Sequence, residues 1–283
     1  MKHLSIRWVV ALLPEAQPLI DRFHLKESAN DSRAGFRVFS SENGDIRLVL
    51  SGIGKTNAAA ATAWLASCET GEPIASLWLN FGIAGSSGLE YGSVCRADRV
   101  TDKESGRSWY PQAVWKKKFD LRGATVESVC RPTDQYPEGN RVVEMEAAGF
   151  YPIALKFASA ELVQVVKVIS DGPANPMKAI TPALATSLCR DALDEIEPWL
   201  EAVADIAAEE QVRLDCPEGF QELLEKWHFT ATQTHQLRRL LHQFRALKPD
   251  NNGVDLSLIE ASSNAREFLS NLRKDLWGDN AKF

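Results

Sequence analysis

The sequence has few cysteines, no long apolar run and no excess of positive charge. The five cysteines are scattered and form no CxxC pair, so neither a zinc ribbon nor a disulfide framework is predicted. No run of 18 apolar residues occurs, so no membrane span is expected. The 32 Lys and Arg residues against 38 Asp and Glu residues give a formal net charge of −6. This balance argues against a nucleic-acid-binding protein.

The N-terminal residues show no small-residue cleavage site of the kind that ends a signal peptide. Met1-Lys2-His3-Leu4 leads directly into an apolar stretch. Together with cysteines that have no evident disulfide partners, this predicts a cytoplasmic protein.

The remaining composition is that of a globular protein. The chain has 283 residues, of which 45% are hydrophobic and 25% charged. This length fits one α/β domain with a small appendage and leaves ample chain for a buried core.

Apolar, strand-like segments alternate with helical ones over the first three quarters of the chain. Strands are predicted at 6–13, 36–39, 46–50, 77–81, 93–100, 124–130 and 162–170, and helices at 56–66, 146–159 and 182–207. This alternation predicts an α/β domain over residues 1–206, with three layers and a mixed, largely parallel sheet flanked by helices. Ligands of such sheets bind outside the carboxyl ends of the strands.

Only helical patterns follow, so residues 207–283 are predicted to be an all-helical extension of unknown role. Helices are expected at 220–227, 232–247, 256–259 and 265–277, with a loop at 250–253. Leu237, Leu240, Leu241 and Phe244 form one apolar stripe that must be buried.

Carboxylates stand where predicted strands end or helices begin. They are Glu15, Glu144, Glu146 and Asp171. Each alone is equally well explained as a helix-capping acid. Together at one sheet edge they suggest a site. The glycine segments 52–54 and 82–85 lack a complete nucleotide-binding fingerprint and, taken alone, predict tight turns between strand and helix.

In combination and order, these segments resemble the nucleoside phosphorylase and nucleosidase superfamily over residues 5–205. The segments are Ala-Leu-Leu-Pro-Glu at 11–15, Leu-Ser-Gly-Ile-Gly-Lys at 50–55, Asn-Phe-Gly-Ile-Ala-Gly at 80–85, Val-Glu-Met-Glu at 143–146 and Ile-Ser-Asp at 169–171. The last two are the most specific. They are similar to the ribose clamp and the base-protonating acid of purine-cleaving members.

The resemblance implies a role for each matching residue. Asp171 would protonate N7 of the departing purine, and Glu15 would activate the attacking water. Glu146 would bind the ribose hydroxyls, with Met145 packed on the sugar. The other implied substrate contacts are Glu144, Ser170, Ala84, Gly85 and Cys130. Separated carboxylates in opposite roles parallel glycoside hydrolysis.

The resemblance favours hydrolysis over phosphorolysis. Phosphorylases of this superfamily bind phosphate through Arg residues. Here Asn80 and Leu13-Pro14-Glu15 stand at those positions. The expected activity is therefore hydrolysis of an adenosine-type purine nucleoside, with no metal or organic cofactor. Methylthioadenosine/S-adenosylhomocysteine nucleosidase-like hydrolases are the nearest relatives implied. A phosphate-dependent purine nucleoside phosphorylase and a non-catalytic nucleoside-binding module are the alternatives.

Two departures from the superfamily pattern concern the pocket. Ile83 stands where nucleosidases have Ser or Thr, and the stretch 108–144 is short. The usual base-stacking aromatic is absent from that stretch, so residues 130–132 and Tyr136 are expected to replace it. The resemblance also implies a homodimer or a higher homo-oligomer.

Overall fold

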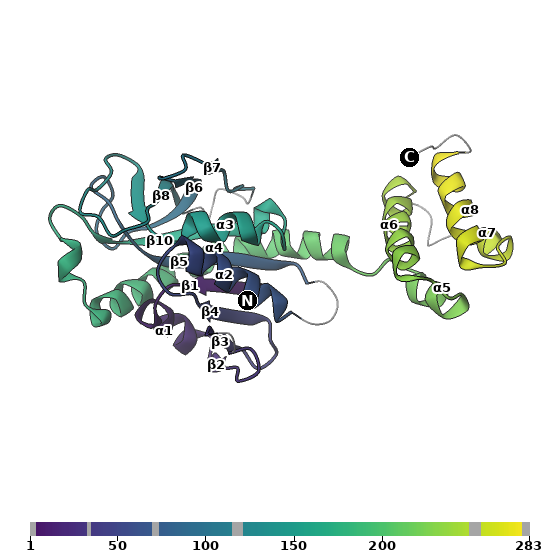
Figure 1. Cartoon of the computed structure of the whole chain (residues 1–283), viewed down its shortest axis with the longest axis horizontal. Coiled ribbons are helices and arrows are strands. Elements are labelled where there is room, and N and C mark those ends of the chain that lie inside the picture. Colours follow the sequence, from purple (N-terminus) through teal and green to yellow (C-terminus); the bar gives the residue numbers. More distant parts are fainter. Residues whose placement is uncertain (1–3, 33–34, 70–73, 115–120, 249–255, 279–283) are drawn as a thin grey trace. The chain divides into compact units, whose positions relative to one another are not determined.

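A computed structural model describes residues 4–32, 35–69, 74–114, 121–248 and 256–278 (Figure 1). The chain forms two compact units, Met1–Gln211 and Val212–Phe283. The predicted loop at 250–253 lies outside the described residues. In the part of the chain that the structure describes, no helix has both the length and the apolar character to cross a membrane.

The strands of the first unit form one mixed sheet, in the order β10-β6-β8-β9-β5-β1-β4-β3-β2, with β7 paired to β6. Each predicted strand is present; the one at 46–50 has the predicted bounds and the others have shifted ends. The strands are β1 Ser5–Val10, β2 Lys26–Glu27, β3 Arg37–Ser40, β4 Ile46–Leu50, β5 Ser76–Gly85, β6 Val94–Asp102, β7 Ser108–Trp109, β8 Arg122–Ser128, β9 Arg141–Glu144 and β10 Val163–Asp171. The predicted hairpin between β3 and β4 is confirmed, and Gly44 at its turn has φ 75°.

The predicted mixed sheet flanked by helices is confirmed, but one part of it is a closed barrel. Strand β10 pairs in parallel with β5 and antiparallel with β6. The chain of pairs β6–β8–β9–β5 then closes a ring, because β9 returns antiparallel to the end of β5 at Gly85. Antiparallel contacts at β10–β6 and β5–β9 thus turn one half of the sheet into a barrel.

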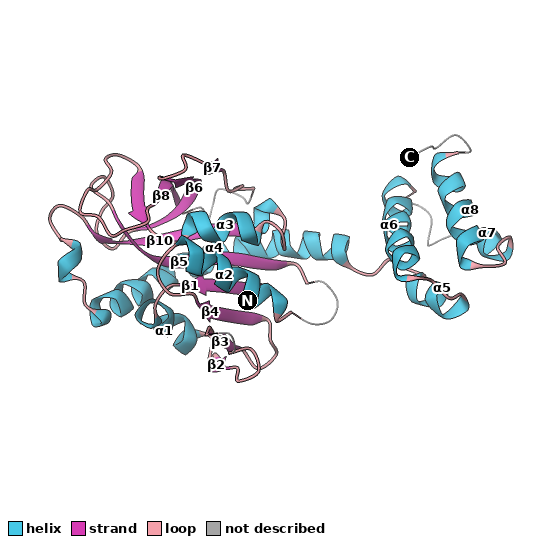
Figure 2. Cartoon of the chain, in the orientation of Figure 1, coloured by secondary structure: helices cyan, strands magenta, loops and turns pink. Residues whose placement is uncertain are grey.

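Helices cover both faces of the part of the sheet that lies outside this barrel (Figure 2). The helices of this unit are α1 Leu13–Arg22, α2 Lys55–Ser67, α3 Ala147–Ala154 and α4 Pro182–Leu214. Alternation along β1 sends Val9 into the core cluster with α2 and α3, whereas Trp8 contacts Phe23 just after α1. Helices α1 and α4 are joined through Arg22 and Asp194.

Two helices differ in length from their predictions. Helix α3 ends at Ala154, short of the predicted 159, and has Pro152 in its last turn. Helix α4 continues to Leu214, past the predicted 207. One reason is that the Gln211 side chain accepts the backbone N–H of Ala75, 2.8 Å away, which anchors the added turn to the start of β5.

The second unit contains only helices in its described residues. They are α5 Phe220–Lys226, α6 Ala231–Leu247, α7 Leu256–Glu260 and α8 Ala265–Trp277. Thr230 begins α6 with a capping box completed by Gln233. The apolar stripe of α6 is buried against α5 and α8 in one cluster with Phe220, Leu223 and Phe268.

Candidate active site

Glu15 lies in the first turn of α1 with only 4% of its surface exposed. One carboxylate oxygen accepts the backbone N–H of Ile83, and the other accepts that of Leu12, each at 2.9 Å. Burial raises the pKa of Glu15, and these two N–H donors oppose that rise. The side chain of Ile83 cannot make a polar contact, and its backbone N–H makes one instead. Glu15 is therefore a fixed, desolvated carboxyl, which suits a proton acceptor.

The glycines of segment 82–85 lie within β5, so the prediction of a turn there is wrong. A Cβ on Gly82 would lie 2.7 Å from Oε1 of Glu15, and one on Gly85 would lie 2.8 Å from Oδ2 of Asp171. These two positions lack side chains because the carboxylates occupy the space beside the strand. Glu15 and Asp171 therefore both pack on β5, at residues whose Cα atoms are roughly 10 Å apart.

Glu144 ends β9, and its carboxylate is fully used by the protein. One oxygen accepts the backbone N–H groups of Glu146 and Ala147, both at 2.9 Å, and the other accepts the hydroxyl of Ser128. Glu144 thus caps the N-terminus of α3, which is the helix-capping role that the sequence analysis gave as the alternative to a site. This leaves little of Glu144 for a ligand and assigns it to holding the Glu146 backbone.

Glu146 lies between α3 and the loop before α2. Its carboxylate accepts the N–H of Gly54 at 2.7 Å, and Gly54 has φ 104°, which favours glycine. Burial, followed by the charge of Glu144, raises the pKa of Glu146 to about 7. Met145, beside it, is half-buried. An acid that titrates near neutrality at a sheet edge is a sign of a functional site.

Lys167 is the residue that the sequence analysis missed. It lies in the middle of β10, is 1% exposed, and its ammonium is 2.9 Å from Oε2 of Glu144. Burial alone would lower its pKa, but the charges of Glu144, Glu146 and Glu15 outweigh that effect and the pKa is raised. One buried cation therefore faces three carboxyls. A Lys inside an apolar strand pattern was the available signal.

Asp171 ends β10 and is buried, with 7% exposed. Its Oδ1 accepts the hydroxyl of Ser170 at 2.6 Å, and that hydroxyl also lies 3.3 Å from the carbonyl of Ala84. Ser170, Ala84, Gly85 and Asp171 are thus brought together, as their resemblance to one motif set implied.

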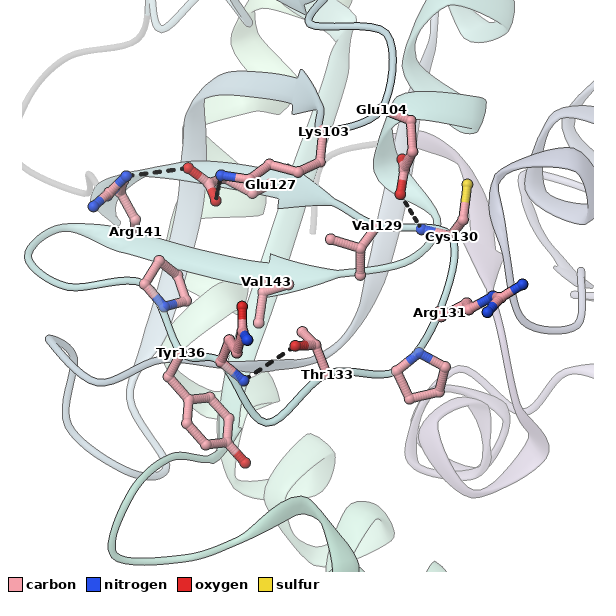
Figure 3. A pocket seen from close by; sticks show the side chains of 13 residues that line it. Lys103, Glu104, Glu127, Val129, Cys130, Arg131, Thr133, Tyr136, Arg141 and Val143 are labelled. Atoms are coloured by element: carbon pink, nitrogen blue, oxygen red, sulfur yellow. Dashed lines mark hydrogen bonds and ion pairs between the residues drawn. The ribbon is translucent and has the colours of Figure 1, made fainter.

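Cys130 belongs to a neighbouring cleft of about 710 Å³ (Figure 3). The cleft is lined by the loop after β8, which includes Arg131 and Tyr136, and by Val143 of β9. The N–H of Cys130 donates to Glu104 at 2.8 Å, and Glu104 also pairs with Lys55, the residue after Gly54. Glu15, Glu146 and Asp171 do not line this cleft, and of its lining residues Tyr136 lies beside Gly85, on which Asp171 also packs.

These features are a set of desolvated carboxyls at one sheet edge, with an open cleft near them. Within the described ranges, no group of three His, Cys, Asp or Glu side chains is arranged to hold a metal ion. The chemistry that such a set can supply is proton transfer together with stabilisation of a positively charged centre.

The chain has a nucleoside phosphorylase/nucleosidase-like fold, as comparison with solved structures shows. An MTA/SAH nucleosidase matches at a TM-score of 0.56 and 18% identity, over 71% of this chain and 98% of that one. The Arabidopsis thaliana 5'-methylthioadenosine nucleosidase matches at 0.54 and 16%, over 71% and 98%. The 5'-methylthioadenosine/S-adenosylhomocysteine nucleosidase of Neisseria meningitidis matches at 0.52 and 20%, over 69% and 100%. No family model and no curated protein matches the sequence.

Proposed function

We propose that the first unit hydrolyses the N-glycosidic bond of an adenosine-type purine nucleoside and releases the free base. The observation that carries this proposal is that Glu15 and Asp171 pack against Gly82 and Gly85, three residues apart on one strand. The charge of Lys167 links Glu146 to Glu15. Carboxyls on opposite sides of a bound sugar are what hydrolysis of a glycosidic bond requires.

The reaction would break the bond between C1' and N9. The bonding electron pair moves to the purine, and Asp171 gives a proton to N7, so the base leaves neutral. Water attacks C1', and Glu15 accepts the water proton. The ionised Glu146 binds the 2'- and 3'-hydroxyls and stabilises the positive charge that develops on the ribose.

Asn80 supports water rather than phosphate as the acceptor. Its side-chain nitrogen donates to the carbonyl of Val9 at 3.0 Å, and the residue is 1% exposed. Its other side-chain atom is an acceptor oxygen without a partner among the described residues. A buried amide that presents only an acceptor does not favour an anion.

The first test is release of free base from a set of purine nucleosides, with and without phosphate. The set includes 5'-methylthioadenosine and S-adenosylhomocysteine, because the structural neighbours are nucleosidases of these compounds. We expect release that does not depend on phosphate. Acceleration by phosphate would show a phosphorylase, and binding without release would show a non-catalytic module.

The second test assigns the roles. Asp171→Asn and Glu15→Gln should each lower turnover by about 10²-fold or more while the fold is kept, because neither amide can transfer the proton. Asp21→Asn, on the exposed side of α1, is the matched control and should leave turnover unchanged. Near-normal turnover by either site variant would remove that residue from the mechanism.

We also propose that the chain associates with copies of itself into a homodimer or a higher homo-oligomer. Size-exclusion chromatography with light scattering tests it, and a monomer at all concentrations would contradict it.

A further inference from the structure

Pro18 lies inside α1, one turn after Glu15, and is buried. Proline has no backbone N–H, so the carbonyl four residues earlier in a helix cannot receive its usual hydrogen bond. In α1 that carbonyl belongs to Pro14, the residue directly before Glu15. The sequence of α1 therefore leaves one carbonyl without its helical donor, beside the residue that we propose as the proton acceptor.

Another helix supplies the missing donor. The hydroxyl of Thr186 in α4 donates to the carbonyl of Pro14 at 2.8 Å, across 172 positions of the chain. One turn further along α4, Cys189 is 0% exposed, and its pKa is raised by burial and then by the negative charge of Glu15. The same face of α4 therefore lies against the first turn of α1 and near Glu15.

The other printed contacts of α1 with α4 lie at the far end of α1. Arg22, in its last turn, pairs with Asp194 at 2.5 Å and with Glu197 at 2.9 Å. The side chain of Arg22 is 38% exposed, and exposed ion pairs contribute little to stability. The bond at Pro14 is therefore the contact with α4 that bears on the position of Glu15.

The carboxylate of Glu15 depends on where this first turn lies. Its Oε2 accepts the N–H of Leu12 in the same turn, whereas its Oε1 accepts the N–H of Ile83 in β5, each at 2.9 Å. A shift of the turn relative to β5 would break the second bond and keep the first. Helix α4 is itself joined to the start of β5 through Gln211 and Ala75. It can therefore hold α1 in place against β5.

We propose that Thr186 is a positioning residue for Glu15. Its hydroxyl replaces the N–H that Pro18 lacks and fixes the first turn of α1 against β5, so Thr186 acts through Pro14 and not on the substrate. This inference rests on the proposed function, in which Glu15 accepts the proton of the attacking water. It adds to that function the residue that keeps the accepting carboxyl in place.

The first test is turnover by Thr186→Val, which keeps the shape of the side chain and removes its donor. We expect kcat to fall by about tenfold, because small displacements of a reacting group slow the chemical step, and KM to stay unchanged. Thr186→Ser keeps the hydroxyl and should retain wild-type turnover. Ser187→Ala, at the exposed neighbour in α4, is the matched control and should change neither quantity.

Pro18→Ala distinguishes this role from a general effect on the fold. It restores the N–H inside α1, so the carbonyl of Pro14 receives its bond within the helix. In this background Thr186→Val should leave kcat unchanged. An equal loss of kcat in both backgrounds would overturn the proposal, as would unchanged kcat in Thr186→Val alone. A Thr186→Val protein that does not fold would overturn it as well, because the hydroxyl would then serve the whole domain.

Amide hydrogen exchange measures the same role without turnover. In Thr186→Val the N–H of Ile83 should exchange about fivefold faster, the net worth of one hydrogen bond, and adding Pro18→Ala should restore the wild-type rate. The N–H of Gly54, which donates to Glu146, should keep its wild-type rate in every variant.

The exchange rates also distinguish this inference from the proposed function. If the wild-type protein releases no base, hydrolysis is contradicted, and exchange at Ile83 still decides whether Thr186 holds Glu15. An unchanged rate at Ile83, or an equal increase at Ile83 and Gly54, would overturn the inference whatever the outcome for base release.

Discussion

The two units of the chain differ in what they bury. The described part of the first unit buries eight charged side chains. They are Arg7, Glu15, Arg96, Glu127, Glu144, Glu146, Lys167 and Asp171. In the described part of the second unit, every buried side chain is apolar except that of Ser262.

The physical reason that this difference matters is the cost of desolvating charge. A buried ion pair rarely stabilises a fold more than an apolar contact of the same size, so its presence calls for another explanation. In the first unit five of the buried charges interact with one another or pack on the second half of β5, where we place the proposed chemistry.

The largest expected effect comes from removing the central cation of the first unit. Lys167→Met leaves Glu144 and Glu146 facing each other without compensation, so the free energy of unfolding should fall by about 3–5 kcal/mol. Lys248→Met removes the exposed partner of Asp275 in the second unit and should cost no more than about 1 kcal/mol. Chemical denaturation of both variants measures the difference, and equal losses would contradict the comparison.

A cavity in the second unit should have the next largest effect and should remain local. Leu237 is 0% exposed, so Leu237→Ala is expected to destabilise the helical unit by about 3 kcal/mol. Hydrogen exchange resolved by peptide should show the loss in residues 220–277 only, with base release unchanged. Leu247→Ala, at a residue 52% exposed, is the control. Loss of protection in β1 or β5 would show that the units unfold together.

Glu146→Gln should lower activity and raise stability, and the gain in stability should depend on pH. Between its ordinary value of 4.5 and about 7, the folded protein holds a proton on Glu146 that the unfolded chain has lost. Stability therefore falls as the pH rises through this window, and the whole cost is present above pH 7. Removing the charge should raise the free energy of unfolding by about 2–3 kcal/mol at pH 8 and by almost nothing at pH 4.

Thermal denaturation at several pH values checks that prediction. Glu42→Gln, an exposed residue, is the control and should show no pH-dependent gain. Base release by Glu146→Gln should fall at pH 8, where the wild-type side chain is ionised, because the neutral amide cannot stabilise the positive ribose. A gain that is the same at pH 4 and pH 8 would show that the raised pKa of Glu146 is not its cause.

The smallest expected effect is that of ending the chain at Leu214. The apolar stripe of the second unit is buried within that unit, and the candidate carboxyls all belong to the first. The shortened protein should therefore keep the melting temperature of the first unit and its base release. If circular dichroism shows a folded protein that is inactive, the helical unit must form part of the pocket or hold the active oligomer together.

The sequence by itself was sufficient for features that depend on local pattern. Continuous apolar runs located β1 and β10, the Asn43-Gly44 pair located the turn between β3 and β4, and the apolar stripe located α6. The resemblance identified Glu15, Glu146 and Asp171 as candidates, and the structure places them at one sheet edge. Local patterns were reliable here because they reflect the backbone preferences of consecutive residues.

Only the tertiary structure decided the features that depend on distant residues. Strand β9 has four residues and no strong pattern, yet its pairing at Gly85 closes the barrel. Gly82 and Gly85 looked like turn residues because nothing in their own segment shows that carboxylates from α1 and β10 lie against them. Lys167 looked like one polar residue in an apolar strand. Its partners, 23 residues away at Glu144 and 152 residues away at Glu15 by number, become visible only when folding brings the charges together. Charge pairing and close packing act through space, and that is why sequence order could not determine them.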